Sequence, residues 1–218
     1  MNDYPVTERN RVKRAHERGK YDRETVHAIL DSGIICHLAY CIDGQPFITP
    51  TSYWRDGEVV YVHGSSASRT LRDMEKGIEA SLAVTHLDGM VMARSGYHHS
   101  MNYRSVIMYG IAKPVTDPDE KLAALKVFMD QIAPGRWDEC RAVNNQEQKA
   151  TTVLAMTLED VSAKVRTGPP VDDEADYASP MWAGVVPIRT VVGDPVDDPK
   201  LSNGAPVPEF AKGFRFTT

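Results

Sequence analysis

Two aspartate-glycine pairs, Asp43-Gly44 and Asp56-Gly57, constrain the fold of this chain more than any other feature of its sequence. Each pair lies between short segments rich in apolar and β-branched residues, and aspartate-glycine is a favoured pair in tight hairpin turns. The pattern therefore predicts three consecutive antiparallel strands over residues 34–40, 46–54 and 59–62. A meander of this kind is the usual beginning of a β-barrel.

The remaining pattern adds strands and a few helices around this meander. Apolar runs predict strands at 80–85, 90–93, 106–115, 152–157 and 161–165, with Leu87-Asp88-Gly89 separating the first two. Helices are expected at 23–32, 120–132 and 145–151, and a helix-like segment at about 70–76. Asp22 is a plausible N-cap for the first helix, and Asp117 or Asp119 for the second. The expected fold class is mainly β with peripheral α-helices.

The length and the proline distribution indicate one domain with a tail. A chain of 218 residues that is 42% hydrophobic is long enough for one packed core. We expect a barrel domain over 1–190 that includes a basic N-terminal arm at 1–20, followed by an extended proline-rich tail at 191–218. The composition already changes at Thr167, and the segment after it should wrap the barrel or a partner subunit. The residues expected to hold it there are Tyr177, Met181, Trp182, Val185 and Val186.

Charge and cysteine content limit the class of protein. The formal net charge of -5 argues against a nucleic-acid binder, which needs a basic face. Three cysteines suit a reduced, cytoplasmic protein better than a disulfide framework. We find no signal-peptide h-region and no run of about 18 apolar residues, so no membrane partner is expected.

A small polar turn follows the third predicted strand and is a candidate anion site. It reads His63-Gly64-Ser65-Ser66-Ala67-Ser68-Arg69 and precedes the helix-like segment. Backbone N–H groups, serine hydroxyls, the helix dipole and the Arg69 guanidinium together favour a phosphate. The alternative is a serine-rich loop that caps a helix for local reasons.

A polar, aromatic run at 97–105 is expected between two strands, at the mouth of the sheet, where it suits a planar hydrogen-bonding ligand. Strand alternation places Asn102 and Arg104 on one side and Tyr103 and Ser105 on the other. The alternative is a polar cluster at the barrel rim. The adjacent histidines His98 and His99 could form a metal site together with His63 or His86. No regular ligand spacing supports such a site, so no metal is expected.

Several motifs together resemble the pyridoxamine 5'-phosphate oxidase-like superfamily, and within it the flavin-nucleotide-binding and nitroimidazole-reductase-related branch. The likeness runs from about residue 10 to 190. It is carried by Arg11 to Arg14, Tyr61-Val62-His63-Gly64 with Ser68-Arg69, His99 to Val106, Glu120-Lys121, Pro134-Gly135-Arg136, Ala163 to Gly168 and Trp182 to Pro187.

The resemblance implies an antiparallel split β-barrel homodimer with flanking helices that binds FMN, or FAD, at the subunit interface. It places His63 beside the cofactor as the catalytic candidate, and Ser68 with Arg69 on the phosphate. Arg104 would pair with a carboxylate or face the flavin ring, and Trp182 would pack in a core or line the pocket. The implied cofactor-binding residues are Thr49, Pro50, Thr51, Ser52, Val62, His63, Gly64, Ser65, Ser68, Arg69, Ser100, Asn102, Tyr103, Arg104 and Trp182.

The function expected from the resemblance is a flavin-dependent oxidoreductase that passes electrons or hydride between NAD(P)H and a small-molecule acceptor. No G-x-G-x-x-G fingerprint is present, so the nicotinamide would bind transiently. One alternative is a non-catalytic flavin carrier or a haem-binding relative that uses a histidine as axial ligand. Another is a pyridoxamine 5'-phosphate oxidase proper, although the C-terminal arginine, leucine and histidine motif of those enzymes has no clear counterpart here.

Overall fold

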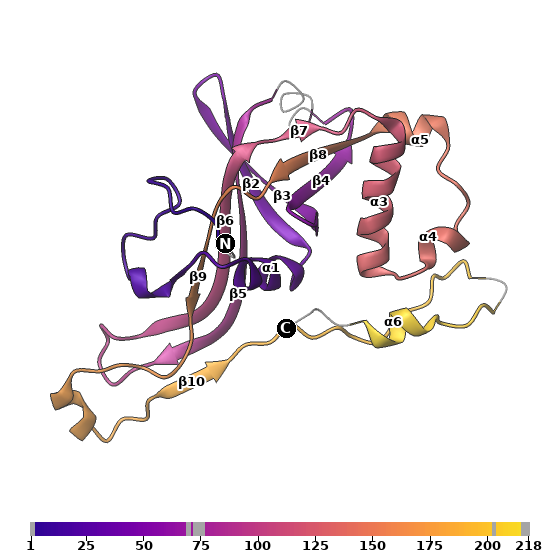
Figure 1. Cartoon of the computed structure of the whole chain (residues 1–218). Coiled ribbons are helices and arrows are strands. Elements are labelled where there is room, and N and C mark those ends of the chain that lie inside the picture. Colours follow the sequence, from indigo (N-terminus) through magenta and orange to yellow (C-terminus); the bar gives the residue numbers. More distant parts are fainter. Residues whose placement is uncertain (1–2, 69–70, 72–76, 202–203, 215–218) are drawn as a thin grey trace.

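The structure is a computed structural model that describes residues 3–68, 71, 77–201 and 204–214. Its main feature is one antiparallel sheet with the strand order β1-β9-β6-β5-β2-β3-β4-β8-β7, with β10 added to β5. The sheet curls into a half-barrel with few helices, which confirms the predicted split β-barrel (Figure 1). The strands are β1 (Gly19–Lys20), β2 (Ile35–Ile42), β3 (Gln45–Asp56), β4 (Val59–Ser65), β5 (Glu79–Met92), β6 (Ser100–Ile111), β7 (Lys113–Pro114), β8 (Thr151–Thr157), β9 (Asp160–Arg166) and β10 (Gly184–Pro187).

The predicted meander is β2-β3-β4, and both aspartate-glycine turns are confirmed. Ile42 pairs with Gln45 across the first turn, where Asp43 and Gly44 both have positive φ. Asp56 pairs with Val59 across the second turn. Strand β8 then continues the sheet from β4, while β9 joins its other end beside β6.

The prediction of two strands separated by Leu87-Asp88-Gly89 is wrong, because β5 runs through this segment with a bulge. Its register against β6 shifts between Leu87 and Gly89. A β-carbon at Gly89 would lie 2.9 Å from Val185 Cγ1 and 3.1 Å from the Val186 carbonyl oxygen, so glycine allows the tail strand β10 to pack here. The turn residues therefore mark an irregularity within a strand and not the end of one.

The predicted 106–115 strand has wrong limits, since β6 begins at Ser100 and ends at Ile111. Most of the 97–105 run, expected between strands, therefore lies on β6. Its inward polar side chains are tolerated because they have partners: Arg104 pairs with Asp88, and the Asn102 amide donates to the Gly168 carbonyl oxygen. The segment after Ala112 forms the short strand β7, which pairs with β8.

The helices are short except for α3, and the observed caps agree with the sequence. The Asp22 carboxylate accepts from the Thr25 backbone N–H, and that of Asp117 from Asp119 and Glu120. The helix predicted at 70–76 lies outside the described residues, apart from Leu71. The helices are η1 (His16–Arg18), α1 (Arg23–Asp31), α3 (Pro118–Ile132), α4 (Arg136–Glu139), α5 (Asn145–Ala150), η2 (Glu174–Ala178) and α6 (Glu209–Gly213). None of these described helices meets the length and hydropathy that a membrane-spanning helix needs.

Two apolar clusters lie on opposite sides of β3 and β4. The larger, called the barrel core, fills the inside of the curled sheet and includes Leu38, Val62, Leu82 and Val106. The smaller, called the α3 cluster, lies between the sheet and helix α3. It is built on Trp54, Ala124 and Val153, with Tyr61, Val115, Leu125, Val127 and Phe128 packed against them.

Candidate functional site

The alternation of β4 places His63 outside the barrel core. Val60 and Val62 are 1% and 3% exposed and point into that core. Their neighbours Tyr61 and His63 therefore project from the opposite face of the strand, toward α3. The His63 ring centroid lies 5.2 Å from that of Phe128 on α3, which agrees with this direction. His63 is thus a residue of the α3 side of the sheet.

Aromatic rings surround His63 within the α3 cluster. The Trp54 indole stacks on Tyr61 at 5.4 Å between centroids and meets His63 edge-on at 5.5 Å. Phe128 completes the group, 5.0 Å from Trp54. Such contacts are favourable beyond simple burial of area. They hold the imidazole in a largely apolar setting.

Two polar atoms in this cluster are buried without partners among the described residues. They are His63 Nδ1 and Trp54 Nε1. Burial lowers the pKa of His63, so its ring is neutral at neutral pH. A buried polar atom without a hydrogen bond is costly and is uncommon in a finished core. A neutral imidazole with an unpaired nitrogen is also the form that coordinates a metal centre.

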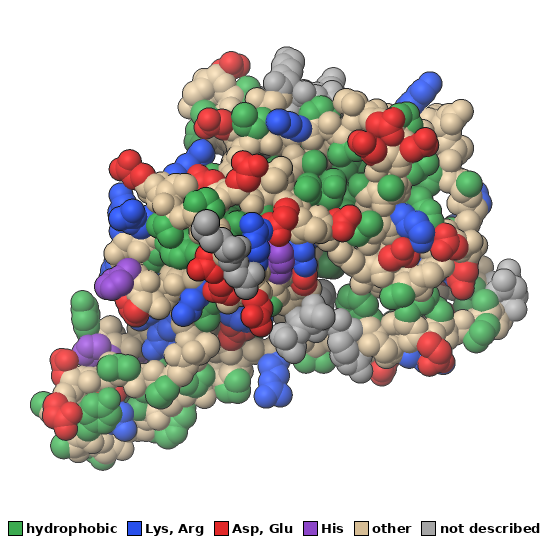
Figure 2. Space-filling view, in the orientation of Figure 1, with side chains coloured by type: hydrophobic (Ala, Val, Ile, Leu, Met, Phe, Trp, Pro, Cys, Tyr) green, Lys and Arg blue, Asp and Glu red, His purple; other side chains and the backbone are tan. Residues whose placement is uncertain are grey.

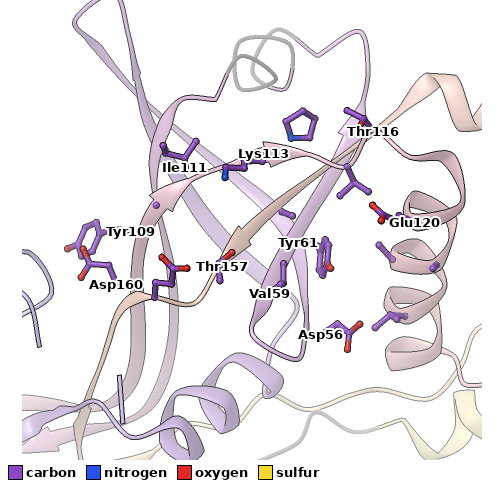
Figure 3. Close-up of a pocket in the computed structure, with 18 of the residues that line it drawn as sticks. Asp56, Val59, Tyr61, Tyr109, Ile111, Lys113, Thr116, Glu120, Thr157 and Asp160 are labelled. Carbon is purple, nitrogen blue, oxygen red and sulfur yellow. The ribbon is translucent and has the colours of Figure 1, made fainter. Parts of the chain in front are cut away.

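A cavity of about 870 Å³ adjoins the α3 cluster and shares Tyr61, Val115, Ala124 and Val127 with it. It lies between α3 and the strands β4, β7 and β8. Figure 3 shows Tyr61 and Glu120 on its facing walls. The walls also include apolar side chains, while the charged lining residues are Arg9, Lys113, Asp56, Glu120, Glu159 and Asp160. The space is large enough for a cofactor-sized molecule.

Three backbone N–H groups of the candidate anion turn at the end of β4 already donate to acceptors of the protein. The Ser66 N–H donates to the Ala150 carbonyl oxygen at 2.8 Å, and the Ser68 N–H donates to that of Ser65 at 2.8 Å. The Ala67 N–H donates to Ser65 Oγ at 3.2 Å. Gly64 is close-packed, because a β-carbon there would lie 2.7 Å from Leu71 Cδ1. A phosphate at this turn would therefore depend on side chains, of which Arg69 lies outside the described residues.

The predicted cofactor segment 49–52 lies on β3 and divides between the two faces of the sheet. Thr49 and Thr51 point inward, and the Thr49 hydroxyl lies 3.3 Å from that of Tyr40. Pro50 and Ser52 point outward, opposite His37 and Ile35 of β2. Only Pro50 and Ser52 of this segment therefore point to the outer surface of the sheet.

A surface without Asp, Glu, Lys or Arg side chains surrounds Pro50 and Ser52 on the outside of β3, β2, β5 and β6, and we call it the outer face. Ile48, Ile35 and Ile107 on it are 65%, 55% and 40% exposed. Strand pairing places small or uncharged side chains between them. The face comprises Ile35, His37, Ala39, Ile48, Pro50, Ser52, Ser81, Ala83, Thr85, Ser105 and Ile107. Exposed isoleucines beside small residues on an open sheet face are typical of a surface that another molecule covers.

The predicted β6 residues have structural partners within the chain. Arg104 makes two hydrogen bonds of 3.0 Å to the Asp88 carboxylate, one of the two arrangements expected for it. Asn102 is buried, and its side-chain oxygen accepts from Arg166. Both face inward, whereas Tyr103 faces outward, as the alternation predicts. Ser100 begins the strand opposite Val91.

Trp182 lies far from the predicted cofactor residues at the end of β4, although β10, which follows it, pairs with β5 close to Ser100. Its side chain is 66% exposed, just before β10. Strand β10 and the end of β4 lie at opposite ends of the molecule (Figure 1). The turn after β4 and Trp182 of one chain are therefore not parts of one pocket.

The histidine pair does not combine with His63 or His86 in the part of the chain that is described. His98 instead lies near Asp172 and Asp176, with one potential ligand atom from each within 4.8 Å of the others. The Asp172 carboxylate already accepts from the Arg94 and Ser95 backbone N–H groups and from the Arg94 guanidinium. This arrangement has the character of a structural ion pair.

Sequence reasoning missed the surroundings of His63. The alternation of Val60, Tyr61, Val62 and His63 was a usable signal, because it separates the histidine from the core-facing valines. Phe128 is 65 positions further on, and no local pattern shows that α3 packs over this strand. The cavity was likewise invisible, since it forms where three distant segments meet.

Comparison with known proteins agrees with this architecture. A family model described as pyridoxamine 5'-phosphate oxidase matches residues 22–165. The structure of the flavocytochrome Anf3 from Azotobacter vinelandii is 45% identical, with a TM-score of 0.92, and covers 96% of this chain and 98% of its own. The FAD and haem binding protein from Mycobacterium smegmatis is 34% identical, with a TM-score of 0.87, over 91% of this chain and 98% of its own.

A more distant likeness concerns the fold alone. A proposed 5-nitroimidazole antibiotic resistance protein from Bacteroides thetaiotaomicron is 15% identical, with a TM-score of 0.57, over 67% of this chain and 86% of its own. No curated protein sequence matches the chain.

Proposed function

The chain belongs to the pyridoxamine 5'-phosphate oxidase family, and on that premise we propose that it is a redox protein that binds both a flavin and a haem. Two structures similar over more than nine tenths of the chain are named for these cofactors, one as a flavocytochrome and one as an FAD and haem binding protein. The observation in this chain that best supports the proposal is that the buried Nδ1 of His63 has no hydrogen-bond partner among the described residues.

His63 is the residue that would hold a haem iron. Burial keeps its imidazole neutral, and a neutral ring nitrogen is what iron coordination requires. Trp54, Tyr61 and Phe128 supply apolar contacts suited to a porphyrin. Tyr61 also lines the adjoining cavity of about 870 Å³, whose described lining residues do not include His63. Bound haem would provide one-electron chemistry at this position. The protein would orient the imidazole and exclude water from it.

The outer face fits the flavin side of the proposal. We propose that two copies pack through this face and enclose the flavin, because an open face with exposed Ile35, Ile48 and Ile107 favours a covering partner. Ser65 and Ser68 with Arg69 would approach the phosphate. We favour FAD over the FMN implied by the sequence, because the Mycobacterium smegmatis protein is named for FAD. NAD(P)H is the proposed reductant, and a small molecule is the proposed acceptor.

Cofactor titration tests the proposal. Purified chain freed of cofactor should take up one flavin per chain, with FAD bound more tightly than FMN, and one haem per chain. NAD(P)H should then reduce the bound cofactors, as seen in the visible spectrum. Flavin uptake without haem would reduce the proposal to the flavin-only oxidoreductase. Uptake of neither cofactor would overturn it.

The outer face has its own test. Ile107→Glu places an uncompensated charge in the proposed contact and should shift the chain from dimer to monomer in analytical ultracentrifugation. Val196→Glu is the matched control, because Val196 is 94% exposed in the tail. A wild-type monomer, or an Ile107→Glu dimer as tight as wild type, would contradict the arrangement.

A further inference from the structure

The cavity of about 870 Å³ has a floor made of side chains from β4 and β8. His63 on β4 is paired with Val153 on β8, and the floor begins two residues further along, where Tyr61 is paired with Ala155. From this pair the described lining extends to the end of β6 and the start of β9. The cavity therefore leads away from His63, and what it binds does not depend on the proposed haem.

Small side chains leave room beside the Tyr61 ring. On β3, Trp54 stacks on one face of this ring with 5.4 Å between the ring centroids. On β8, the residue paired with Tyr61 is Ala155, whose methyl group is too small to cover the other face. Further small residues line the cavity, namely Gly110, Ala123 and Ala124. The Tyr61 ring therefore presents to the cavity the face that Trp54 does not cover.

Two carboxylates lie near the Tyr61 hydroxyl. Burial raises the pKa of Tyr61, and the negative charges of Asp56 and Glu120 raise it further, so both acids are close to the phenol. Asp56 ends β3, and Glu120 lies in the first turn of α3. Figure 3 shows all three side chains on the α3 side of the cavity, and Figure 2 shows acidic side chains gathered over the start of α3. Within the described part of the chain, neither carboxylate has an ion-pair or hydrogen-bond partner.

The charges of the described lining have a negative balance. They are the carboxylates of Asp56, Glu120, Glu159 and Asp160 and the cations of Arg9 and Lys113. Arg9 is already engaged, because its guanidinium lies 4.6 Å from the centre of the Tyr109 ring and 3.8 Å from the Glu79 carboxylate. A cleft lined mainly by charges of one sign attracts ligands of the opposite sign. The cavity therefore favours a positively charged ligand.

We propose that this cavity binds a planar aromatic amine in its cationic form, with the ring of the ligand on Tyr61 and its ammonium group toward Asp56 and Glu120. An aromatic face and carboxylates are the groups that recognise an organic cation. Val115 and Val127 also line the cavity, which favours a ligand with an apolar body over a small inorganic cation. This site goes beyond the proposed flavin and haem function and requires neither cofactor.

A matched series of ligands tests the charge preference. Tryptamine, tryptophol and indole-3-acetate share an indole ring and are cationic, neutral and anionic at neutral pH. In isothermal titration calorimetry of the purified protein with its cofactors, one tryptamine should bind per chain. Tryptophol should bind at least about tenfold more weakly, and indole-3-acetate more weakly still. Equal affinities for tryptamine and tryptophol, or no binding of tryptamine, would overturn the proposal.

Variants of the lining locate the bound ligand. The double variant Asp56→Asn, Glu120→Gln should bind tryptamine about tenfold more weakly and tryptophol as wild type does. Asparagine before Gly57 keeps a pair that is favoured in tight turns. Ala155→Leu fills the space beside Tyr61 and should weaken both ligands at least about tenfold. Glu24→Gln is the matched control and should bind like wild type, because Glu24 is exposed on α1 and does not belong to the described lining.

Wild-type affinity for tryptamine in the double variant or in folded Ala155→Leu would place the ligand elsewhere and overturn the proposal. Urea unfolding of each variant shows whether it is folded, and the double variant decides the question if Ala155→Leu is not. A protein that binds flavin and haem but no tryptamine would overturn this inference alone. A protein that binds tryptamine as described but neither cofactor would overturn the proposed function and support this site.

Discussion

The barrel core and the α3 cluster share strands β3 and β4, and they differ in how completely their polar atoms are paired. In the barrel core, the buried Tyr53 hydroxyl donates to the Leu30 carbonyl oxygen at 2.5 Å. In the α3 cluster, Trp54 Nε1 and His63 Nδ1 are buried without a partner among the described residues. Tyr53 and Trp54 are adjacent on β3. The polar group of Tyr53 is hydrogen-bonded in the barrel core, whereas that of Trp54 in the α3 cluster has no partner among the described residues.

This difference separates the part of the molecule that specifies the fold from the part that is suited to a ligand. A satisfied apolar core contributes stability through burial and close packing. A small cluster with buried polar atoms that lack hydrogen-bond partners contributes less stability than its buried area suggests. Such atoms are expected where a bound ligand supplies the missing partner. The comparison therefore predicts opposite effects on stability for changes on the two sides of the sheet.

Leu82→Ala should have the largest effect, since it creates a cavity in the barrel core. Leu82 is fully buried, and such truncations cost about 2–5 kcal/mol. Urea unfolding of the apoprotein measures this loss. A matched truncation on the outer face, Ile48→Ala, should change the stability of the monomer by less than about 1 kcal/mol. Equal losses for the two variants would remove the distinction between the inner and outer sides of the sheet.

His63→Leu should stabilise the apoprotein. The change removes a buried nitrogen that has no partner in the described part of the chain. An unsatisfied buried polar group costs about 1–3 kcal/mol. Part of this gain is offset by imperfect packing of the new side chain, so we expect a net increase of about 1 kcal/mol in the free energy of unfolding. A loss of more than about 1 kcal/mol would mean that the imidazole has a partner in the folded apoprotein.

Trp54→Phe should have a smaller effect, because two contributions oppose each other. The smaller ring loses contacts with Tyr61 and Phe128. The change also removes the indole N–H, which has no acceptor within residues 3–68, 71, 77–201 and 204–214. The change in unfolding free energy should stay within about 1 kcal/mol. The same measurement on Tyr53→Phe, which removes a bonded hydroxyl from the barrel core, should show a clear loss. A reversed order would contradict the comparison.

Among the predicted changes, lowering the pH should have the weakest effect on the free energy of unfolding. Burial lowers the folded-state pKa of His63 below the ordinary value of about 6.5 that applies in the unfolded chain. Between these two values the unfolded state binds more protons, so stability falls as the pH is lowered from about 7. Burial lowers the pKa of His27 as well, which adds to the same trend.

Unfolding of wild-type and His63→Leu apoprotein at pH 7.5, 6.5 and 5.5 separates the two histidines. The variant should lose less stability on acidification than wild type, because only His27 then contributes. Parallel pH profiles would show that His63 titrates alike in the folded and unfolded chains.

Much of the fold was predictable from local sequence, and much of the site was not. The Asp43-Gly44 and Asp56-Gly57 turns identify the meander because turn geometry depends on adjacent residues. The continuity of β5 through Gly89 was missed, since its cause is a tail strand almost a hundred residues later. A bulge and a loop share the same turn residues in sequence.

The site was predictable only as a set of residues and not as an arrangement. His63 was identified as a candidate from its position before the serine-rich turn, but the rings around it come from β3 and α3. Arg104 has a carboxylate partner, Asp88, because the β5 bulge places that residue beside it. Such pairings depend on tertiary packing, which single-sequence periodicity does not encode.

Haem titration of the apoprotein, followed by absorbance in the Soret region, tests the assignment of His63 most directly. Wild type and His16→Leu, whose histidine side chain is 86% exposed, should each bind one haem per chain with a shifted Soret band. His63→Leu, which should remain folded, should bind haem at least about a hundredfold more weakly and without that band. Haem binding by His63→Leu with unchanged affinity and an unchanged band would contradict His63 as the ligand.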